Sequence, residues 1–317
     1  MKHIFFINPA AGKRDCTGEC TRQIHRELAS WGEEFEIHIS QGPGDITGLA
    51  RRYAATGEEL RFYACGGDGT LNELAAGAAG FSNVAITHLP WGSGNDFIKI
   101  FDKPEAFSSL AAFRDPEEAA FDLIGCNGDY ALNICSVGLD ARIGTRVSAY
   151  KKLPFIGGSG AYILSLLVNV LGGIAEHYEV EINGKRIRGE QTLICAANGR
   201  FYGGGFNPVP EADPTDGLLD VLVIKKVSLL TVARVVGKYK EGRWKELPAY
   251  IRHFRTNRIR VFCDGATAIN LDGELREASV VDISVAPVKI RFFYPKGLSY
   301  AAARERAEAA EEGALVK

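Results

Sequence analysis

The first 125 residues alternate short apolar runs with longer stretches in which apolar positions recur every three or four residues. The runs have the length of buried strands, and the longer stretches have the period of amphipathic helices. Strands that alternate with helices usually form a parallel sheet covered by helices. This part of the chain therefore predicts an α/β domain, with strands at 3–8, 35–39, 60–65 and 84–89 and helices that include 16–31 and 45–55.

The pattern changes after Asp122, where short β-like runs follow one another and turn sequences separate them. Such a pattern is typical of an antiparallel β domain. The predicted strands are 130–135, 178–182, 191–197, 218–224, 258–263, 266–271 and 280–285. The predicted turns contain Asn183-Gly184, Asp216-Gly217, Asp264-Gly265 and Asp272-Gly273.

Helices interrupt this second region near 139–151, 161–171 and 228–240. A last strand, 289–294, and an Ala/Glu-rich helix from Ser299 are expected to return to the first domain. We therefore expect an α/β domain of residues 1–125, joined by about 292–317, and a β domain of residues 126–291.

The composition is that of an ordinary soluble globular protein, with 46% hydrophobic and 24% charged residues among 317. The net charge of −2 gives no whole-chain electrostatic reason to expect nucleic acid as a partner. The longest apolar stretch is shorter than the ~20 residues of a spanning helix, and we expect no signal peptide. Most cysteines lie in strand-like runs, which predicts buried, reduced thiols and a cytoplasmic location.

The most informative stretch is 62–73, in which an apolar run ends at Gly66-Gly67-Asp68-Gly69 and a helix is expected to open at Thr70. Glycines let the backbone approach a ligand closely, and a helix N-terminus binds phosphate. A carboxylate among them suits Mg²⁺ between acid and phosphate. The alternative is a tight turn in which Thr70 and Glu73 form a capping box.

Other clusters carry weaker signals. Asn8-Pro9-Ala10-Ala11-Gly12-Lys13 and the segment 90–97 also follow predicted strands, and either could be an ordinary turn, the second capped by Ser93 and Asp96. Glycines beside aromatics at 201–206 suggest a cleft wall, and the acids at 213–220 could hold a metal. Asp272-Gly273 alone favours a plain hairpin turn.

The order and spacing of these motifs resemble those of the bacterial soluble lipid kinases of the diacylglycerol kinase and sphingosine kinase superfamily, from about Ile4 to Tyr294. The resemblance implies an NAD kinase/phosphofructokinase-like nucleotide-binding domain with a parallel sheet, an antiparallel β-sandwich lipid-substrate domain, and an active site between them. It implies transfer of the γ-phosphoryl group of ATP to a lipid hydroxyl, with diacylglycerol as the default acceptor. Phosphatidylglycerol, ceramide and sphingoid bases stay open, as does a nucleotide other than ATP.

The resemblance also implies residue roles. The nucleotide would contact Asn8, Pro9, Gly12, Lys13, Ser40, Gly66, Gly67, Asp68, Gly69, Thr70, Glu73, Ser93, Asn95 and Asp96. Catalytic Mg²⁺ would lie among Asp68, Asp96 and Asp122, and a second, structural Mg²⁺ would be held by Asp213, Asp216 and Leu218. Asp272 would be the general base, and Glu274 would position it or the metal.

The chain departs from the family pattern at two positions. Trp91-Gly92-Ser93-Gly94 stands where the family usually has Gly-Thr before its Asn-Asp, and Ser40 stands where threonine is more common. Two other functions stay open: an NAD kinase-like enzyme, which would share the Gly-Gly-Asp-Gly-Thr loop, and an inactive relative that binds nucleotide, lipid or a protein partner.

Charge is segregated along the chain. Residues 225–258 contain two acids, Glu241 and Glu246, and ten basic residues: Lys225, Lys226, Arg234, Lys238, Lys240, Arg243, Lys245, Arg252, Arg255 and Arg258. This predicts transient contact with the inner face of the membrane, and the alternative is a solvated basic face. The expected partners are a lipid substrate at that surface and no nucleic acid, and a homodimer stays open.

Overall fold

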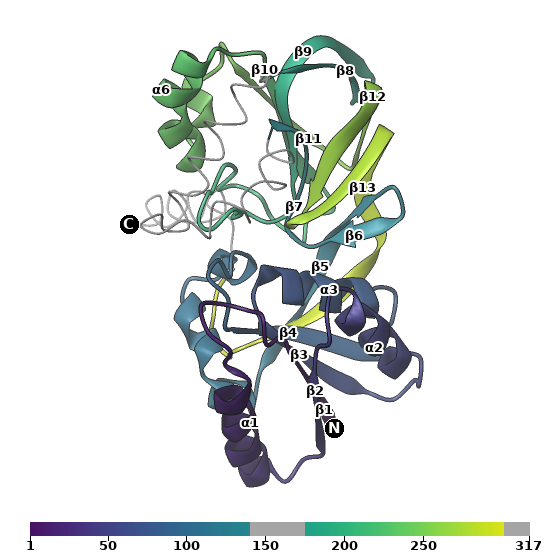
Figure 1. The fold of residues 1–317 in the computed structure, drawn as a ribbon, viewed down its shortest axis with the longest axis vertical. Helices are drawn as coiled ribbons and strands as arrows, with labels where there is room; N and C mark the ends of the chain where they lie inside the picture. The colour runs from purple at the N-terminus through teal and green to yellow at the C-terminus, as the bar shows by residue number, and fades with distance from the viewer. Residues whose placement is uncertain (140–174, 301–317) are drawn as a thin grey trace, which may run out of the picture. The chain divides into compact units, whose positions relative to one another are not determined.

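The computed structural model describes residues 1–139 and 175–300. The fold is mixed α/β with much antiparallel sheet, and it divides into two compact units (Figure 1). Unit 1 contains Met1–Leu123 and Ala286–Tyr300, and unit 2 contains Ile124–Val285. The helix predicted at 161–171 lies outside the described residues, as does nearly all of the one predicted at 139–151 and of the one from Ser299.

The sheet of unit 1 has the order β4–β3–β1–β2, and all neighbours in it run parallel. The end of β13 (Glu274–Tyr294) joins β4 in parallel, with Arg291 opposite Ala85. The central strands are apolar on both faces because both faces are covered. Their bounds are β1 Lys2–Ile7, β2 Phe35–Ile39, β3 Leu60–Gly66 and β4 Val84–Pro90.

Three helices pack on this sheet: α1 (Thr17–Trp31), α2 (Asp45–Ala54) and α3 (Asp68–Ala78). In α1 the buried residues Cys20, Ile24 and Leu28 recur every four positions and form one apolar stripe. Gly77 lets α2 and α3 approach closely, since a Cβ there would lie 2.7 Å from the Thr47 carbonyl oxygen. The 3₁₀ turns Phe97–Ile100, Pro104–Ser108 and Leu110–Phe113 complete the unit.

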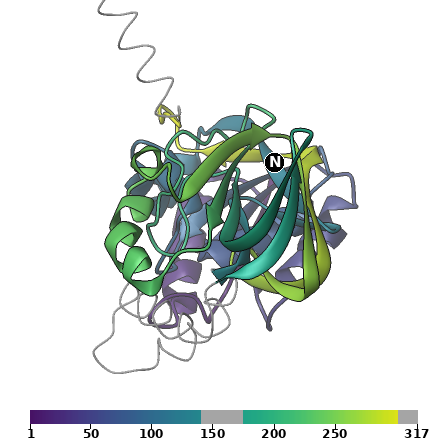
Figure 2. The same cartoon turned by 90° about the horizontal axis from the view of Figure 1, so that it is seen from above.

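Unit 2 is built from antiparallel strands that curve around one apolar core (Figure 2). Along β9 (Lys185–Ala197), the first half pairs with β8 (Glu176–Ile182) and the second half with β7 (Ile134–Gly138). Strand β12 (Arg258–Leu271) pairs with the same two strands, which closes the core between them. The remaining elements are β5 Glu117–Cys126, β6 Asp129–Ala131, β10 Leu219–Lys225, α6 Leu229–Lys240, the 3₁₀ turn Trp244–Glu246 and β11 Ile251–Thr256.

Several predicted turns and ends are confirmed and others are wrong. Asn183-Gly184 forms the β8–β9 hairpin with φ of 49° and 70°, and Ser228 caps α6 by accepting from the Thr231 amide. Asp264-Gly265 is not a turn, because β12 continues through it with a register irregularity between Phe262 and Thr267. The runs 280–285 and 289–294 are parts of the single strand β13, and β5 and β11 were not predicted.

Cys65, Cys135 and Cys195 are buried as predicted, whereas Cys263 is only partly buried, and all described cysteines are free thiols. Among the helices of the described residues, none is long and apolar enough to cross a membrane.

Candidate active site

The carboxyl ends of β1, β2, β3 and β4 lie along one edge of the parallel sheet, and each is followed by a loop that contains predicted nucleotide contacts. Backbone hydrogen bonds join these loops. The Asn8 amide donates to the Cys65 carbonyl (3.0 Å), the Ser40 amide to Ile7 (2.8 Å) and the Trp91 amide to Gly66 (2.8 Å). The edge of an α/β sheet at the strand carboxyl ends is where such folds bind ligands.

The glycines of these loops are required by contacts between the loops themselves. A Cβ on Gly92 would lie 2.4 Å from the Cα of Gly67, and a Cβ on Gly66 would lie 2.2 Å from the Thr70 hydroxyl. Gly12 has a positive φ of 79°, and its Cβ would lie 2.5 Å from the Trp91 carbonyl oxygen. The first, third and fourth loops therefore form one packed surface.

Helix α3 begins at Asp68, two residues earlier than predicted. The capping box of the alternative interpretation is wrong, because Thr70 and Glu73 lie inside the helix and its N-cap, Gly67, has no side chain. The Thr70 hydroxyl instead accepts a hydrogen bond from the Asn8 side chain (3.1 Å). The first amides of a helix have no partner within the helix, so this N-terminus presents donors suited to a phosphate.

Asp68 and Asp96 lie close together. The Asp68 carboxylate accepts from the Asp96 amide (2.5 Å), and a Cβ on Gly94 would lie 2.6 Å from Asp68 Oδ2 and 3.5 Å from Asp96 Oδ2. Burial, and then the neighbouring charge of Asp96, raise the pKa of Asp68 to about 6. Asp96 does not cap the following 3₁₀ turn, and its carboxylate pairs with Lys99 at 2.5 Å. Two crowded carboxylates beside phosphate donors fit a divalent cation.

Asp122, the third predicted member of this acidic set, lies in unit 1 on β5 and is buried at 2% exposure. It forms an ion pair with Lys289 (2.9 Å). A lysine thus compensates its charge, and its place near a cation stays a prediction.

In unit 2, Asp272 forms the β12–β13 hairpin turn with Gly273, at φ of 50° and 98°, so the hairpin prediction is confirmed. Its carboxylate accepts hydrogen bonds from three successive backbone amides, those of Leu132 (2.6 Å), Asn133 (2.9 Å) and Ile134 (2.7 Å). These donors fix the orientation of the carboxylate. Glu274 is partly exposed and lies 3.8 Å from Arg276 Nη1.

The sequence predicted one strand over 130–135, which is wrong, because β6 ends at Ala131 and β7 begins at Ile134. The contacts that hold Asp272 at this break were not predicted. Asn198 donates from its side chain to the Leu132 carbonyl (2.7 Å), and the Asn198 and Gly199 amides both donate to Asn133 (2.9 and 3.0 Å). A Cβ on Gly199 would lie 1.8 Å from the Asn133 side-chain oxygen. The only local signal was Asn-Gly directly after a predicted strand, which indicates a turn but names no partner.

The acidic turn at 213–218 does not fit a divalent cation bound through Asp216. Asp216 accepts from the Leu218 amide (2.9 Å) with one oxygen and pairs with Arg255 through the other. Arg255 also lies 3.8 Å from Asp220, and Asp213 accepts from the Thr215 amide (2.9 Å) and hydroxyl (2.6 Å). Within the described residues, no group of three His, Cys, Asp or Glu is placed to bind a metal.

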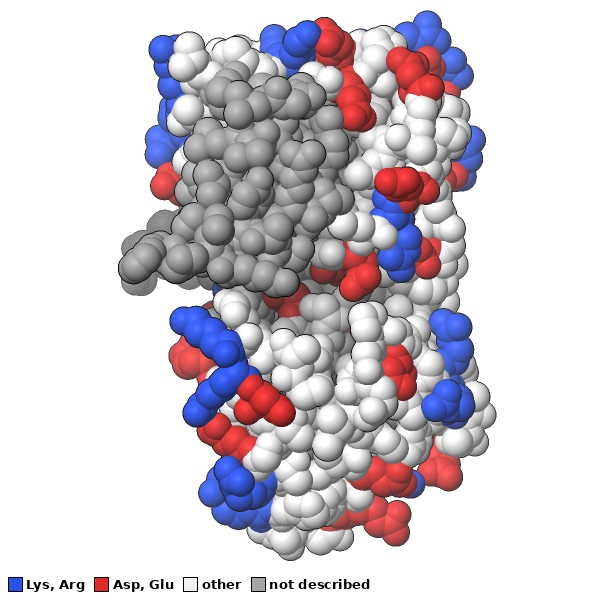
Figure 3. All heavy atoms as spheres, in the orientation of Figure 1, with Lys and Arg blue, Asp and Glu red and all other residues white. Residues whose placement is uncertain are grey.

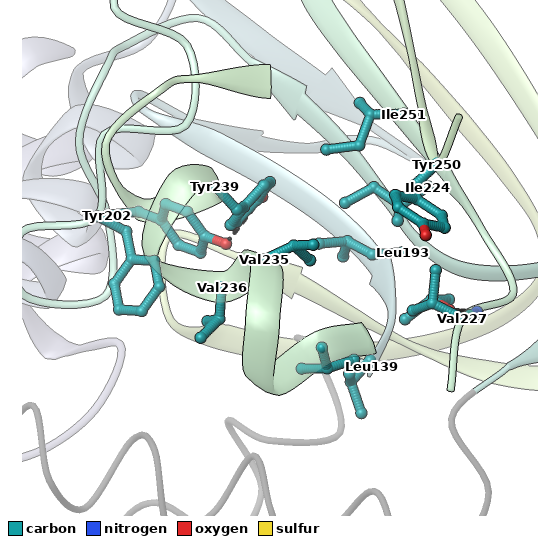
Figure 4. A pocket seen from close by; sticks show the side chains of 13 residues that line it. Leu139, Leu193, Tyr202, Ile224, Val227, Val235, Val236, Tyr239, Tyr250 and Ile251 are labelled. Carbon is teal, nitrogen blue, oxygen red and sulfur yellow. Dashed lines mark hydrogen bonds between the residues drawn. The ribbon is translucent and has the colours of Figure 1, made fainter. Parts of the chain in front are cut away.

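Unit 2 also contains an apolar cavity of about 80 Å³ between the outer face of its sheet and α6 (Figure 4). Leu193, Ile224 and Ile251 line it from the strands, and Val235, Val236 and Tyr239 from the helix. Tyr202 and Phe206, from the predicted glycine-aromatic wall, also line it. The Tyr202 and Tyr239 hydroxyls form a hydrogen bond with each other (3.1 Å). Such a lining suits a hydrocarbon chain.

Two family models match nearly the whole chain. Residues 2–125 match the diacylglycerol kinase catalytic domain, and residues 133–294 match the YegS C-terminal NAD kinase beta sandwich-like domain. The chain is a bacterial diacylglycerol kinase-like lipid kinase by family. In this lipid kinase, the glycine loops at the edge of the parallel sheet lie within the residues that match the first model. Asp272 lies within the residues that match the second.

Named relatives agree with the family. A protein of Staphylococcus carnosus (strain TM300) named "Putative lipid kinase" is 26% identical over 92% of this chain and 96% of its own. One of Staphylococcus aureus (strain JH9), with a similar name, is 29% identical over 85% and 89%. A solved structure titled as a putative diacylglycerol kinase from Bacillus anthracis str. Sterne matches with a TM-score of 0.71 at 20% identity, over 94% of this chain and 97% of that one. At this identity the last match shows the fold.

Proposed function

We propose that this lipid kinase transfers the γ-phosphoryl group of ATP to the hydroxyl of diacylglycerol and so forms phosphatidic acid. The observation that supports ATP most directly is the packed edge of four loops with Asp68 and Asp96 beside the N-terminus of α3. Phosphoryl transfer asks a protein mainly for positioning and charge neutralisation, and this edge supplies both.

The nucleotide would lie on the loops. The α3 amides, with Gly66, Gly67 and Gly69, would face its phosphates, and the loop residues Asn8, Pro9, Gly12, Lys13, Ser40, Ser93 and Asn95 would surround it. Asp68 and Asp96 would hold Mg²⁺, and Asp122 would add to the acidic environment of the cation. When bound, Mg²⁺ would neutralise phosphate charge and polarise the γ-phosphoryl group.

In the transfer, the lipid hydroxyl oxygen forms a bond to the γ-phosphorus. The bond from that phosphorus to the β–γ bridging oxygen breaks, and ADP leaves with the electron pair. The hydroxyl proton passes to the Asp272 carboxylate, which the three amides hold in one orientation. Glu274, next to the turn, would position the acceptor or the metal.

The acceptor is proposed to be a lipid because unit 2 holds the apolar cavity. To test this, purified protein is given labelled ATP and Mg²⁺ with vesicles that contain diacylglycerol, phosphatidylglycerol, ceramide or a sphingoid base, and in a separate reaction with NAD. Label in phosphatidic acid supports the proposal. Label in another lipid corrects the acceptor, label in NADP favours the NAD kinase alternative, and no label in any product favours an inactive relative.

A further inference from the structure

Helix α6 has apolar residues on two opposite faces, and only one of these faces packs against the rest of unit 2. Val232 and Tyr239 are buried, and with the half-buried Val235 and Val236 they wall the apolar cavity. On the opposite face Leu230 is 69% exposed, more than any other large hydrophobic residue that the structure describes. Its neighbour one turn on is the exposed Arg234.

The charge of α6 has one sign. The helix carries Arg234, Lys238 and Lys240 and no acidic residue, and Lys225 and Lys226 precede it. Lys225 lies 5.8 Å from the ring centre of Tyr250, and Lys240 lies 5.5 Å from that of Phe206. Both rings line the cavity, so cations lie directly over its aromatic walls.

The remainder of the basic segment is largely neutralised. Arg243 pairs with Glu246, Lys245 with Glu211, Arg255 with Asp216 and Arg258 with Asp282. Lys226 and Lys238 also have acidic partners, Glu190 and Glu246. Among the described residues, four cations of this segment are left without an acidic partner: Lys225, Arg234 and Lys240 on or beside α6, and Arg252 on β11. Three of the four therefore lie around α6, and blue spheres mark the upper left edge where Figure 1 places this helix (Figure 3).

We propose that the exposed face of α6 docks on an anionic lipid bilayer, with Leu230 inserted among the lipids and Lys225, Arg234 and Lys240 at the headgroups. A bilayer fits better than a protein partner, because the face offers one leucine among cations rather than a continuous apolar surface. The same helix separates this face from the hydrocarbon-lined cavity, so docking would hold the cavity wall at the membrane.

The test measures binding of the full chain to sedimenting vesicles without nucleotide. Wild type is expected to bind vesicles that contain phosphatidylglycerol, to bind phosphatidylcholine vesicles poorly, and to release at high salt. Arg234→Glu should weaken anionic binding by about fivefold or more, since each basic residue contributes about 1 kcal/mol near such a surface. Leu230→Ser should weaken it by about tenfold through lost apolar burial.

Two control variants make the result specific to α6. Lys185→Glu reverses an exposed lysine in the β8–β9 hairpin, and Val280→Ser removes a 43% exposed valine on β13. Both should bind like wild type. The proposal is overturned if wild type binds neutral and anionic vesicles equally, or if the control variants lose as much binding as the α6 variants.

A second readout rests on the proposed function. Leu230→Ser and Arg234→Glu should lose activity on diacylglycerol in anionic vesicles but keep it on a short-chain diacylglycerol dispersed as monomers. If wild type phosphorylates neither the diacylglycerol in vesicles nor the short-chain one, the proposed function fails. The sedimentation result still decides the docking proposal in that case.

Discussion

At the scale of single residues, the candidate site is built from charges that the fold holds in unfavourable surroundings. Asp68 is taken from water and placed beside Asp96, and this raises its pKa to about 6. A group that lowers stability when ionised indicates a role that packing does not supply. The sequence predicted Asp68 as the unusual member of its loop, but its contact with Asp96 depends on two loops that are far apart in the chain.

Asp68→Asn should stabilise the unliganded protein at neutral and higher pH. The folded pKa of about 6 lies above the ordinary 3.8, so the folded state binds more protons than the unfolded state between these values. The free energy of unfolding therefore falls as pH rises through this window, and the loss, up to about 3 kcal/mol, persists above it. Urea unfolding of both proteins should diverge from about pH 4 to pH 6, with Asp68→Asn the more stable above that window.

The same variant should lose the stabilisation that Mg²⁺ and ATP give to wild type, because the cation loses a ligand. The exposed carboxylate Asp264 offers a control, and Asp264→Asn should change neither property. If the free energy of unfolding changed with pH in the same way for wild type and Asp68→Asn, the proposed effect of burial on Asp68 would be contradicted.

Arg255→Gln tests whether an arginine takes the place of a cation at the 213–218 turn. Without the guanidinium, Asp216 and the buried Asp220 lose a positive neighbour, and stability should fall by about 1–3 kcal/mol. In an Asp68→Asn background, added Mg²⁺ should leave the Tm of wild-type Arg255 unchanged and raise that of Arg255→Gln. A Mg²⁺ response in the Arg255 protein that Asp216→Ala removes would place a structural cation at this turn instead.

Asp272→Asn should reduce turnover by at least ~10²-fold if the carboxylate takes the hydroxyl proton. The three amides that it accepts from add a second effect, because an amide nitrogen would face an N–H donor and cost about 1–3 kcal/mol of stability. Gly273→Ala strains the same turn at φ 98° and leaves the carboxylate in place. Equal losses of turnover in the two variants at equal stability would show that only the hairpin matters.

At the scale of elements, the sequence predicted strands and helices well where one physical signal dominated. The segment 35–39, in which apolar and polar residues alternate, is a strand with the same bounds, and 228–240 is a helix that starts from its serine cap. Predictions failed where pairing overrode a local signal. Asp264-Gly265 predicts a turn, yet β12 continues through it, because the residues on either side pair with β8 and β13. Strand β11 was missed because its polar residues give a weak apolar pattern.

The candidate site was predictable to the same limited degree. The residues of the glycine loops could be predicted because glycines before a helix start form a known kind of phosphate-binding site. Their mutual packing, the three amides around Asp272 and the pairing of Asp216 with Arg255 could not, since each joins residues that no local pattern relates.

The glycines at the loop edge permit a matched test. Gly92→Ala should destabilise the protein by about 1–3 kcal/mol and weaken ATP binding, because its Cβ would lie 2.4 Å from the Gly67 Cα and push two loops apart. Gly69→Ala, in the first turn of α3, meets nothing within 4 Å and should be stabilising by about 0.5–1 kcal/mol.

The affinity for ATP then shows whether Gly69 is needed for loop packing or for the approach of a phosphate. If phosphate approaches the start of α3, Gly69→Ala should weaken ATP binding, measured by calorimetry, while the unliganded protein gains stability. Unchanged ATP affinity in Gly69→Ala would contradict the placement of phosphate at this helix N-terminus.

At the scale of the whole molecule, the two units should contribute separable steps of one reaction. The nucleotide contacts proposed here all come from unit 1, whereas the apolar cavity belongs to unit 2. A change in the cavity should therefore alter the use of lipid and leave ATP binding as it was.

Val236→Phe fills part of the cavity, which Val236 lines from α6. If the cavity holds part of an acyl chain, the larger ring would exclude some methylenes, and the loss of two at about 0.8 kcal/mol each should raise KM for a long-chain diacylglycerol by about tenfold. KM for a short-chain diacylglycerol and the affinity for ATP should not change. Ala29→Phe adds the same ring to an exposed position of α1 in unit 1 and should leave all three as in wild type. An equal rise in KM for long and short chains would show that the cavity does not receive the chain, and that the acceptor lipid is recognised elsewhere.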